Sequence, residues 1–177
     1  MNTDIRKVTL HDIGNLQKIS RQTFYETFSD TNTEENMKNY LKDNFSVDKL
    51  TVEINDKNVE FYFATLDDTV IGYLKINFGQ SQSELQDDNG IEIERIYVIK
   101  EFQGKKIGQI LYNKAIEVAG QKNADYVWLG VWEENVRAIN FYRKNGFLEF
   151  DKHIFKFGND EQTDIMMKLK MNNLFKT

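Results

Sequence analysis

The sequence predicts an α+β fold in which one mixed sheet carries helices on its faces. Two observations lead to this expectation. Apolar residues recur at helical spacing in four stretches, and seven other stretches have the composition of strands. Their order is β–α–α–β–β–β–α–β–α–β–β, which combines hairpins with helical crossovers. Because no repeat or Pro/Ser-rich linker divides the 177 residues, we expect a single domain over residues 1–177.

The first third of the chain is expected to be mainly helical. A short strand is predicted at IRKVTL, residues 5–10. Two helices follow from their apolar spacing: Ile13, Leu16 and Ile19 mark the first, and Met37, Tyr40, Leu41 and Phe45 mark the second. Thr33 stands before the acidic residues of EEN, so we expect it to be the N-cap of the second helix.

The middle of the chain is predicted to form strands. EFYFATL at residues 60–66 and VIGYLKINFG at residues 70–79 are joined by a turn around DDT, which predicts a hairpin. The polar stretch from Gln80 to Gly90 is expected to be a loop. IEIERIYVI, residues 91–99, then predicts a further strand.

The strand at residues 91–99 has an irregular apolar pattern. Ile91 and Ile93 share one parity, whereas Ile96 and Val98 have the other. Because side chains alternate with a period of two, this change needs a one-residue slip, which a β-bulge supplies. The remaining residues after Arg95 are apolar too, so a strand buried on both faces explains the pattern as well. Both interpretations stay open at this point.

The last part of the chain alternates between helices and strands. An apolar stripe over 107–119 predicts a helix of four turns, and ADYVWLGVW at 124–132 predicts a strand. A short helix is predicted between Asn135, its expected N-cap, and Gly146, the residue expected after its C-terminal end. The two final strands are expected at 147–158 and 163–171.

The composition excludes several kinds of chemistry. The chain has no cysteine, which rules out disulfides, thiolate ligands and a cysteine nucleophile. Its two histidines, His11 and His153, lie far apart in the sequence and cannot form a three-histidine zinc site. We therefore expect no metal.

The charge and hydropathy patterns predict a cytoplasmic protein. A net charge of −5 disfavours sequence-independent binding to nucleic acid and mildly favours cationic partners. Most acidic residues are nevertheless expected to be a solvated surface. The N-terminus has no apolar leader region, and no apolar run approaches the length of about 18 residues needed for a membrane span. We expect neither nucleic-acid nor membrane partners.

QGKKIG, residues 103–108, connects a strand to a helix. The first amides of a helix lack intrahelical partners and carry partial positive charge, so this place suits a phosphate group. Gly104 and Gly108 let the backbone approach a ligand, and Lys105 and Lys106 add charge. A plain turn with solvated lysines is the alternative. The spacing fits neither the P-loop nor the dinucleotide-binding pattern.

QGKKIG after an apolar strand, followed about 30 residues later by VWEENVRAINFYRKNGF, resembles the GNAT superfamily of N-acetyltransferases. The resemblance implies a mostly antiparallel central sheet of about seven strands, helices on both faces, and a bulged and splayed fourth strand. It also implies acetyl-CoA as cosubstrate. The family motif is Q/R-x-x-G-x-G/A, and this sequence has Lys106 where the family usually has its first glycine.

A narrower resemblance extends over most of the chain. TEENMKNYL, EIERIYV, WLGVWEEN and GNDEQTDIMM are similar to segments of bacterial PaiA-type spermidine/spermine N-acetyltransferases. This similarity implies a polyamine as the substrate. Acetylation of another amine, such as a peptide N-terminus or an antibiotic, is an alternative within the same class. A regulatory module that binds acyl-CoA without turnover is an alternative from another class.

The family resemblance assigns cofactor binding to Ile96, Tyr97, Val98, Gln103, Gly104, Lys105, Lys106, Ile107, Gly108, Asn135 and Lys144. In this assignment the main chain of Ile96 and Val98 holds the pantetheine arm, and the Val98 amide polarises the thioester carbonyl. Asn135 contacts the same arm, although its N-cap role would also explain it. Lys144 is placed near the phosphates or on the plain surface.

The resemblance also suggests the catalytic groups. Glu94 is the candidate base that removes a proton from the amine, with Glu92 second; a solvent-facing position or a pair with Arg95 is the structural alternative. Tyr142 matches the family tyrosine that protonates the departing thiolate, whereas alone it would be read as a core residue.

Further acids are expected along the path of a polycation. The candidates lie in one bend of the sequence, although a solvated helix connection is the alternative for each of them: Glu26, Asp30, Glu34 and Glu35. A homodimer through the exposed edges of the final hairpin is left open.

Overall fold

The computed structural model describes residues 2–173, and the chain forms two compact units. Unit 1 contains the chain up to Ile76 together with Arg95–Ala115, and unit 2 contains Asn77–Glu94 and the chain from Ile116 onward. Strands β3 (Thr69–Phe78) and β4 (Gly90–Val98) and helix α4 (Ile107–Gln121) each pass from one unit into the other. The chain thus changes unit inside regular elements, and the single domain over residues 1–177 remains a prediction.

Unit 1 holds the strands β1 and β2, β3 up to Ile76 and the end of β4 from Arg95, hydrogen-bonded in that order. β1 (Thr3–Lys7) is antiparallel to β2 (Val59–Leu66), from the pair Thr3↔Leu66 to the pair Lys7↔Tyr62. The predicted strand at residues 5–10 is therefore displaced toward the C-terminus. The reason lies in Asp12, which accepts hydrogen bonds from the amide and hydroxyl of Thr9 and turns the chain into a short 3-10 helix.

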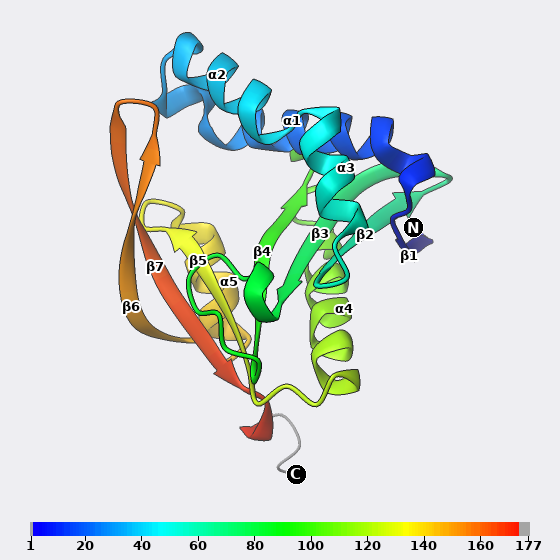
Figure 1. Cartoon of the computed structure of the whole chain (residues 1–177), viewed down its shortest axis with the longest axis vertical. Helices are drawn as coiled ribbons and strands as arrows, with labels where there is room; N and C mark the ends of the chain where they lie inside the picture. Colours follow the sequence, from blue (N-terminus) through cyan, green and yellow to red (C-terminus); the bar gives the residue numbers. More distant parts are fainter. Residues whose placement is uncertain (1, 174–177) are drawn as a thin grey trace. The chain divides into compact units, whose positions relative to one another are not determined.

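Along the chain, three α-helices of unit 1 connect β1 to β2 (Figure 1). The sequence predicted two. The three helices are α1 (Ile13–Phe28), α2 (Glu34–Asn44) and α3 (Val47–Asn55). Thr33 caps α2 as predicted, since its side chain accepts from the Asn36 amide. α3 was not predicted; the Ser46 side chain caps it by accepting from the Lys49 amide.

Aromatic side chains join the first helices of unit 1. The rings of Phe24 on α1 and Tyr40 on α2 are stacked with centroids 4.3 Å apart, and Phe45 approaches Phe24 to 5.6 Å. Such contacts add to the free energy gained from burying the rings. The helical periodicity of the first third thus produces a packed layer.

The predicted hairpin between β2 and β3 is confirmed, with a two-residue loop. Asp67 and Asp68 both have positive φ, at 46° and 65°. This is the backbone that a tight turn between right-twisted strands requires, and aspartate tolerates it better than most residues.

Unit 2 holds the first part of β4 with β5, β7 and β6, in that order (Figure 1). β5 (Tyr126–Trp132) is parallel to β4 over Gly90–Glu92 and antiparallel to β7 (Asp160–Lys170). β6 (Leu148–Phe157) pairs with β7 as an antiparallel hairpin. The predicted α+β fold with one mixed, mostly antiparallel sheet of seven strands is confirmed for the described residues. The bulge and splay of β4 remain predictions.

The elements of unit 2 begin and end close to where the sequence places them. Asn135 caps α5 (Val136–Lys144) by accepting from the Ala138 amide at 3.2 Å. Gly146 follows the helix with φ of +95°, as a residue after a helix end often does. A bulge between Glu149 and Asp151 interrupts the register of the final hairpin.

The predicted loop from Gln80 to Gly90 forms no strand before Gly90, but part of it is buried. Gln82 is only 2% exposed. Its side chain accepts a hydrogen bond from Trp128 Nε1 at 2.7 Å and donates to the carbonyls of Gly79 and Asp87. These bonds fix residues 79–89, the Gln82 loop, onto the rest of unit 2.

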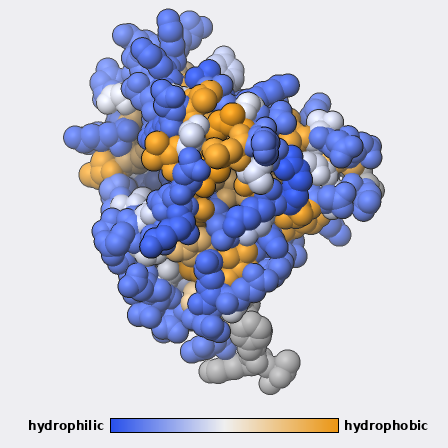
Figure 2. Space-filling view, turned by 45° about the vertical axis from the view of Figure 1, so that its right-hand side comes forward, coloured by the Kyte–Doolittle hydropathy of each residue, from blue (hydrophilic) through white to orange (hydrophobic). Residues whose placement is uncertain are grey.

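Apolar side chains also reach the surface of the molecule. Figure 2 shows apolar atoms among hydrophilic ones on one face. Over the described residues, Leu148 and Val52 are the most exposed large apolar side chains, at 74% and 71%. Within the same residues, no helix is both long and apolar enough to cross a membrane.

Candidate active site

The segment between β4 and α4 in unit 1 is built from backbone hydrogen bonds. After Val98, the Ile99 amide donates to the Ile71 carbonyl at 2.9 Å. A 3-10 turn over Lys100–Phe102 follows. The Gln103 side chain then donates back to the Val98 carbonyl at 3.1 Å. These bonds set where the chain leaves the sheet and enters the turn before α4.

The turn itself uses two residues with left-handed backbone. Gly104 has φ of +78° and Lys106 has φ of +67°. The Lys106 carbonyl accepts from the Ile110 amide at 3.2 Å, so α4 begins directly after this lysine. Lys106 thus adopts the conformation for which the family motif has glycine, at a cost of roughly 1 kcal/mol in backbone energy.

The start of α4 is open to a ligand. A Cβ atom built on Gly108 would meet no atom within 4 Å, so packing within the protein does not require this glycine. The first turn of α4 contains no acid, and Lys105, Lys106 and Gly104 are exposed. Helix-start amides, lysines and a bare Cα fit the diphosphate of coenzyme A.

Gly72 on β3 makes a close approach that the sequence analysis missed. A Cβ on this residue would lie 2.8 Å from the Tyr97 carbonyl oxygen and 3.2 Å from Leu111 Cδ1. Only glycine allows β3 to lie this close to the part of β4 assigned to the pantetheine arm. A glycine inside an otherwise apolar strand was the available signal.

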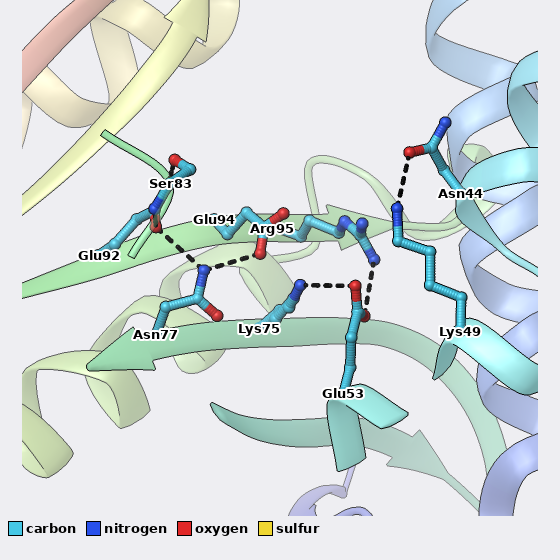
Figure 3. A network of polar contacts seen from close by, with 9 residues as sticks. All are labelled: Asn44, Lys49, Glu53, Lys75, Asn77, Ser83, Glu92, Glu94 and Arg95. Atoms are coloured by element: carbon cyan, nitrogen blue, oxygen red, sulfur yellow. Dashed lines mark hydrogen bonds and ion pairs between the residues drawn. The ribbon is translucent and has the colours of Figure 1, made fainter. Parts of the chain in front are cut away.

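Two cations share one carboxylate in unit 1 (Figure 3). Lys75 Nζ lies 3.2 Å from Glu53 Oε1, and Arg95 Nη1 lies 3.9 Å from Glu53 Oε2. The Arg95 guanidinium also stands over the Phe45 ring at 4.7 Å. The sequence analysis considered a pair between Arg95 and the glutamates of β4 as the alternative to a catalytic role. In the structure, Arg95 has Glu53 as an ion-pair partner.

Four polar residues of unit 2 form a second group, which we call the Asn77 network (Figure 3). Asn77 Nδ2 donates to Glu92 Oε2 at 3.0 Å and to Glu94 Oε2 at 2.8 Å. The Ser83 amide donates to Glu92 Oε2 at 2.8 Å, and the Ser83 hydroxyl donates to Glu92 Oε1. The structure therefore joins the two candidate bases through one amide nitrogen.

The two glutamates of the Asn77 network differ in their surroundings. Glu92 is 3% exposed, and burial followed by repulsion from Glu94 raises its pKa, against hydrogen bonds from Ser83 and Asn77. Glu94 is partly exposed. Of the two, only Glu94 has a partly exposed side chain. Sequence reasoning missed Asn77 and Ser83, although a polar residue in the apolar run VIGYLKINFG was a usable signal.

The candidate residues of α5 occupy ordinary helical positions. Tyr142 is 6% exposed, and its ring lies 5.4 Å from that of Phe141 and 5.6 Å from that of Phe147. Asn135 serves as N-cap, and Lys144 is exposed in the last turn. The geometry agrees with packing and capping, and the cofactor and acid roles stay predictions.

The acids predicted to meet a polycation lie at different elements of unit 1. Glu26 accepts from the Lys100 amide at 2.9 Å and from the Gln22 side chain at 3.1 Å, which links α1 to the turn after β4. Asp30 lies in a 3-10 turn, and Glu34 and Glu35 occupy the exposed first turn of α2. Within residues 2–173, no three metal-ligating side chains come together as a metal site.

A family model described as Acetyltransferase (GNAT) family matches residues 15–147. The chain belongs to the GNAT family of acetyltransferases. This GNAT protein is thus an acyltransferase with acetyl-CoA as its cosubstrate, as the sequence predicted.

Relatives align with this GNAT protein over most of its length. It is 41% identical over 164 residues to an uncharacterised N-acetyltransferase in the pepI 3′ region of Lactobacillus delbrueckii subsp. lactis, covering 93% of this chain and 95% of that protein. It is 28% identical over 151 residues to the spermidine N(1)-acetyltransferase of Thermoplasma acidophilum, covering 83% and 89%. The crystal structure of the PaiA N-acetyltransferase of T. acidophilum with coenzyme A matches it with a TM-score of 0.79 at 27% identity, over 96% of this chain and 99% of that one.

Proposed function

We propose that this protein transfers the acetyl group of acetyl-CoA to a primary amine of a polyamine such as spermidine or spermine. The observation that carries the proposal is the pair of carboxylates, Glu92 and Glu94, that Asn77 holds together on one strand. The partly exposed Glu94 carboxylate, next to the buried Glu92, suits a substrate that arrives as a polycation. The similarity to a spermidine N(1)-acetyltransferase and to the PaiA N-acetyltransferase supports the same substrate class.

Cofactor binding is assigned to the turn and the strand before it. Acetyl-CoA supplies the acetyl group as a thioester. The first amides of α4 with Lys105 and Lys106 bind the diphosphate, and the main chain of Ile96 and Val98 holds the pantetheine arm. The Val98 amide polarises the carbonyl; donors of this kind typically contribute about 3 kcal/mol. Asn135 and Lys144 are assigned supporting contacts.

Proton transfer is assigned to two side chains. A primary alkylammonium has a pKa of about 10, so its nitrogen must lose a proton before it can attack. Glu94 accepts that proton, directly or through water. As the C–N bond forms and the C–S bond breaks, Tyr142 donates a proton to the leaving sulfur. The acids of unit 1, Glu26 among them, are assigned weaker attraction of the polycation.

A panel of amines tests the substrate class. The purified protein is incubated with acetyl-CoA and spermine, spermidine, a monoamine or a peptide with a free N-terminus, and thiol release is followed. We expect the highest kcat/KM with spermidine or spermine. If only the peptide or the monoamine is acetylated, the proposal of a polyamine substrate is refuted. If coenzyme A binds but no amine is acetylated, the protein is a non-catalytic module.

Substitutions in the catalytic groups test the mechanism. We expect Tyr142→Phe and Glu94→Gln to lower kcat by about 10²-fold or more, the range of general acid–base catalysis, while acetyl-CoA still binds. Tyr112→Phe is the matched control, because Tyr112 is also a buried helical tyrosine, 4% exposed, to which the mechanism gives no role. An unchanged kcat for Tyr142→Phe would count against the assigned acid.

A further inference from the structure

Glu92 and Glu94 are two residues apart on β4, and one amide nitrogen binds both. Side chains at this spacing point to the same face of a strand, with Cα atoms about 7 Å apart. Asn77 Nδ2 lies 3.0 Å from Glu92 Oε2 and 2.8 Å from Glu94 Oε2. An asparagine amide nitrogen carries two hydrogens, so each carboxylate receives one of them. Asn77 thereby fixes the two carboxylates relative to each other.

Packing alone does not explain an asparagine at this position. Asn77 is 2% exposed, and its Oδ1 atom is buried without a hydrogen-bond partner among the described residues. Burying an amide with an unsatisfied oxygen is unfavourable, and an apolar residue of similar size would avoid that cost. The position thus keeps its nitrogen on the two carboxylates although its own oxygen is left unsatisfied. Such a feature is typical of a residue held for function.

The two carboxylates receive different support. Glu92 accepts from the Ser83 hydroxyl on one oxygen, and from the Ser83 amide and Asn77 on the other. Ser83 belongs to the Gln82 loop, so the Glu92 side chain is anchored to buried structure. Glu94 is partly exposed and is tied to this anchored group through Asn77. Asn77 is therefore the link between a fixed carboxylate and an accessible one.

We propose that Asn77 is a positioning residue for acetyl transfer: it holds the Glu94 carboxylate at a fixed place beside the anchored Glu92, where Glu94 accepts the proton of the incoming amine. Ser83 supports it by holding Glu92. The inference rests on the base role given to Glu94 in the proposed function. It adds that this role depends on a side chain of β3 that touches neither the amine nor acetyl-CoA.

Asn77→Leu tests the proposal by removing both donors while keeping the approximate volume. At pH 7.5 we expect kcat to fall about 10- to 100-fold, with KM for acetyl-CoA within twofold of the wild type. At pH 9.5 the loss is expected to shrink, because a larger fraction of the amine is already deprotonated and needs the base less. Asn77→Ser keeps one donor, so its kcat is expected to lie between those of Asn77→Leu and the wild type. This variant replaces Asn77→Leu in the test if the leucine variant does not fold.

Gln162→Leu is the matched control in the same unit. Gln162 is also a buried amide, 8% exposed, with an oxygen that lacks a hydrogen-bond partner among the described residues. Its Nε2 donates to Asp160 and to neither glutamate of β4. We expect its kcat to stay within twofold of the wild type. An equal loss of kcat in the Gln162 and Asn77 variants, or the same loss at both pH values, would overturn the positioning role.

A readout without turnover separates this inference from the proposed function. Carboxyl ¹³C NMR follows the titration of Glu94 in the wild type and in both leucine variants. Asn77→Leu removes a hydrogen bond to the Glu94 carboxylate, so the pH midpoint of the Glu94 titration is expected to shift. In Gln162→Leu this midpoint is expected to stay unchanged. A wild type that acetylates no amine would refute the proposed function, whereas an unchanged Glu94 titration in Asn77→Leu would refute the role of Asn77.

Discussion

The turn before α4 and the Asn77 network are built from different groups and differ in their exposure to solvent. The turn offers backbone groups at exposed positions, with Gly104 and Lys106 in left-handed conformations. The network consists of side chains, and two of them, Asn77 and Glu92, are almost fully buried. The first region therefore depends mainly on the path of the chain and on the positive charge that it carries. The second depends on the identity of each side chain.

The largest effect is expected from a change that moves the backbone of unit 1. In Gly72→Ala the new Cβ would lie 2.8 Å from the Tyr97 carbonyl oxygen, so β3 or β4 must shift. We expect a loss of about 1–3 kcal/mol in the free energy of unfolding, measured by urea denaturation, and a higher KM for acetyl-CoA.

Gly130→Ala is the control for this backbone effect. Gly130 also lies in a strand, but its Cβ would come no closer than 3.5 Å to another atom, Asp164 Oδ2. We expect little change in stability and none in KM for acetyl-CoA. Equal behaviour of the two alanine variants would show that the close approach of β3 does not shape the cofactor segment.

An effect of similar size on stability is expected where a buried side chain of unit 2 is changed. Trp128→Phe removes the indole N–H that donates to Gln82 Oε1 and leaves a buried acceptor unsatisfied. The expected cost is about 1–3 kcal/mol in thermal or urea unfolding. Tyr126→Phe removes an exposed hydrogen bond to Asp87 and is expected to cost less than 1 kcal/mol. A larger loss from Tyr126→Phe would contradict the importance given to burial.

Asp164 predicts a pH-dependent effect in unit 2. Burial raises its pKa to about 6, His153 opposes this shift, and Glu84 adds to it. The folded state therefore binds a proton more tightly than the unfolded state, and stability falls as pH rises from about 4 through about 6. After allowance for solvent screening, we expect Asp164→Asn to raise the free energy of unfolding by roughly 1 kcal/mol at pH 8.

The same comparison at low pH serves as the check on Asp164. At pH 4 the carboxyl is protonated in the folded state, so Asp164→Asn is expected to have little effect there. The exposed Asp88→Asn is the control and should show no such dependence. A stabilisation of Asp164→Asn that is independent of pH would assign the effect to packing.

The smallest effect is expected in the turn itself. Lys106→Gly relieves a positive φ of 67° and is expected to raise the free energy of unfolding by a few tenths to about 1 kcal/mol. Because the proposed function assigns the lysine charge to diphosphate binding, KM for acetyl-CoA is expected to rise a few-fold. Lys105→Gly changes the same residue type without relieving a positive φ, so it should not stabilise the protein. Stabilisation by both substitutions would contradict the conformational explanation.

Features that depend on neighbouring residues could be predicted from the sequence. Thr33 and Asn135 cap helices as expected, because a cap needs only its own side chain and the next few amides. The hairpins and the turn at Gly146 follow from local chemistry in the same way. α3 had a comparable signal in Ser46, which precedes an apolar run at helical spacing.

Features that join distant segments could not be predicted. Glu92 and Glu94 were proposed as alternatives for one role, but their sharing of Asn77 depends on how β3 and β4 are aligned. The stretch from Gln80 to Gly90 was predicted as a polar loop, and nothing in its composition shows that Trp128 binds it. Pairing register decides such contacts, and register is set by the whole sheet.

The hydrogen bond between Trp128 and Gln82 gives the protein a built-in optical reporter. The indole is 1% exposed, and release of the Gln82 loop would bring water to it and move its fluorescence emission to longer wavelength. Because the chain has no cysteine, a single cysteine introduced in this loop would also accept a thiol-specific dye at one place. Movement of the loop that holds Ser83 can thus be followed in two independent ways while an amine binds.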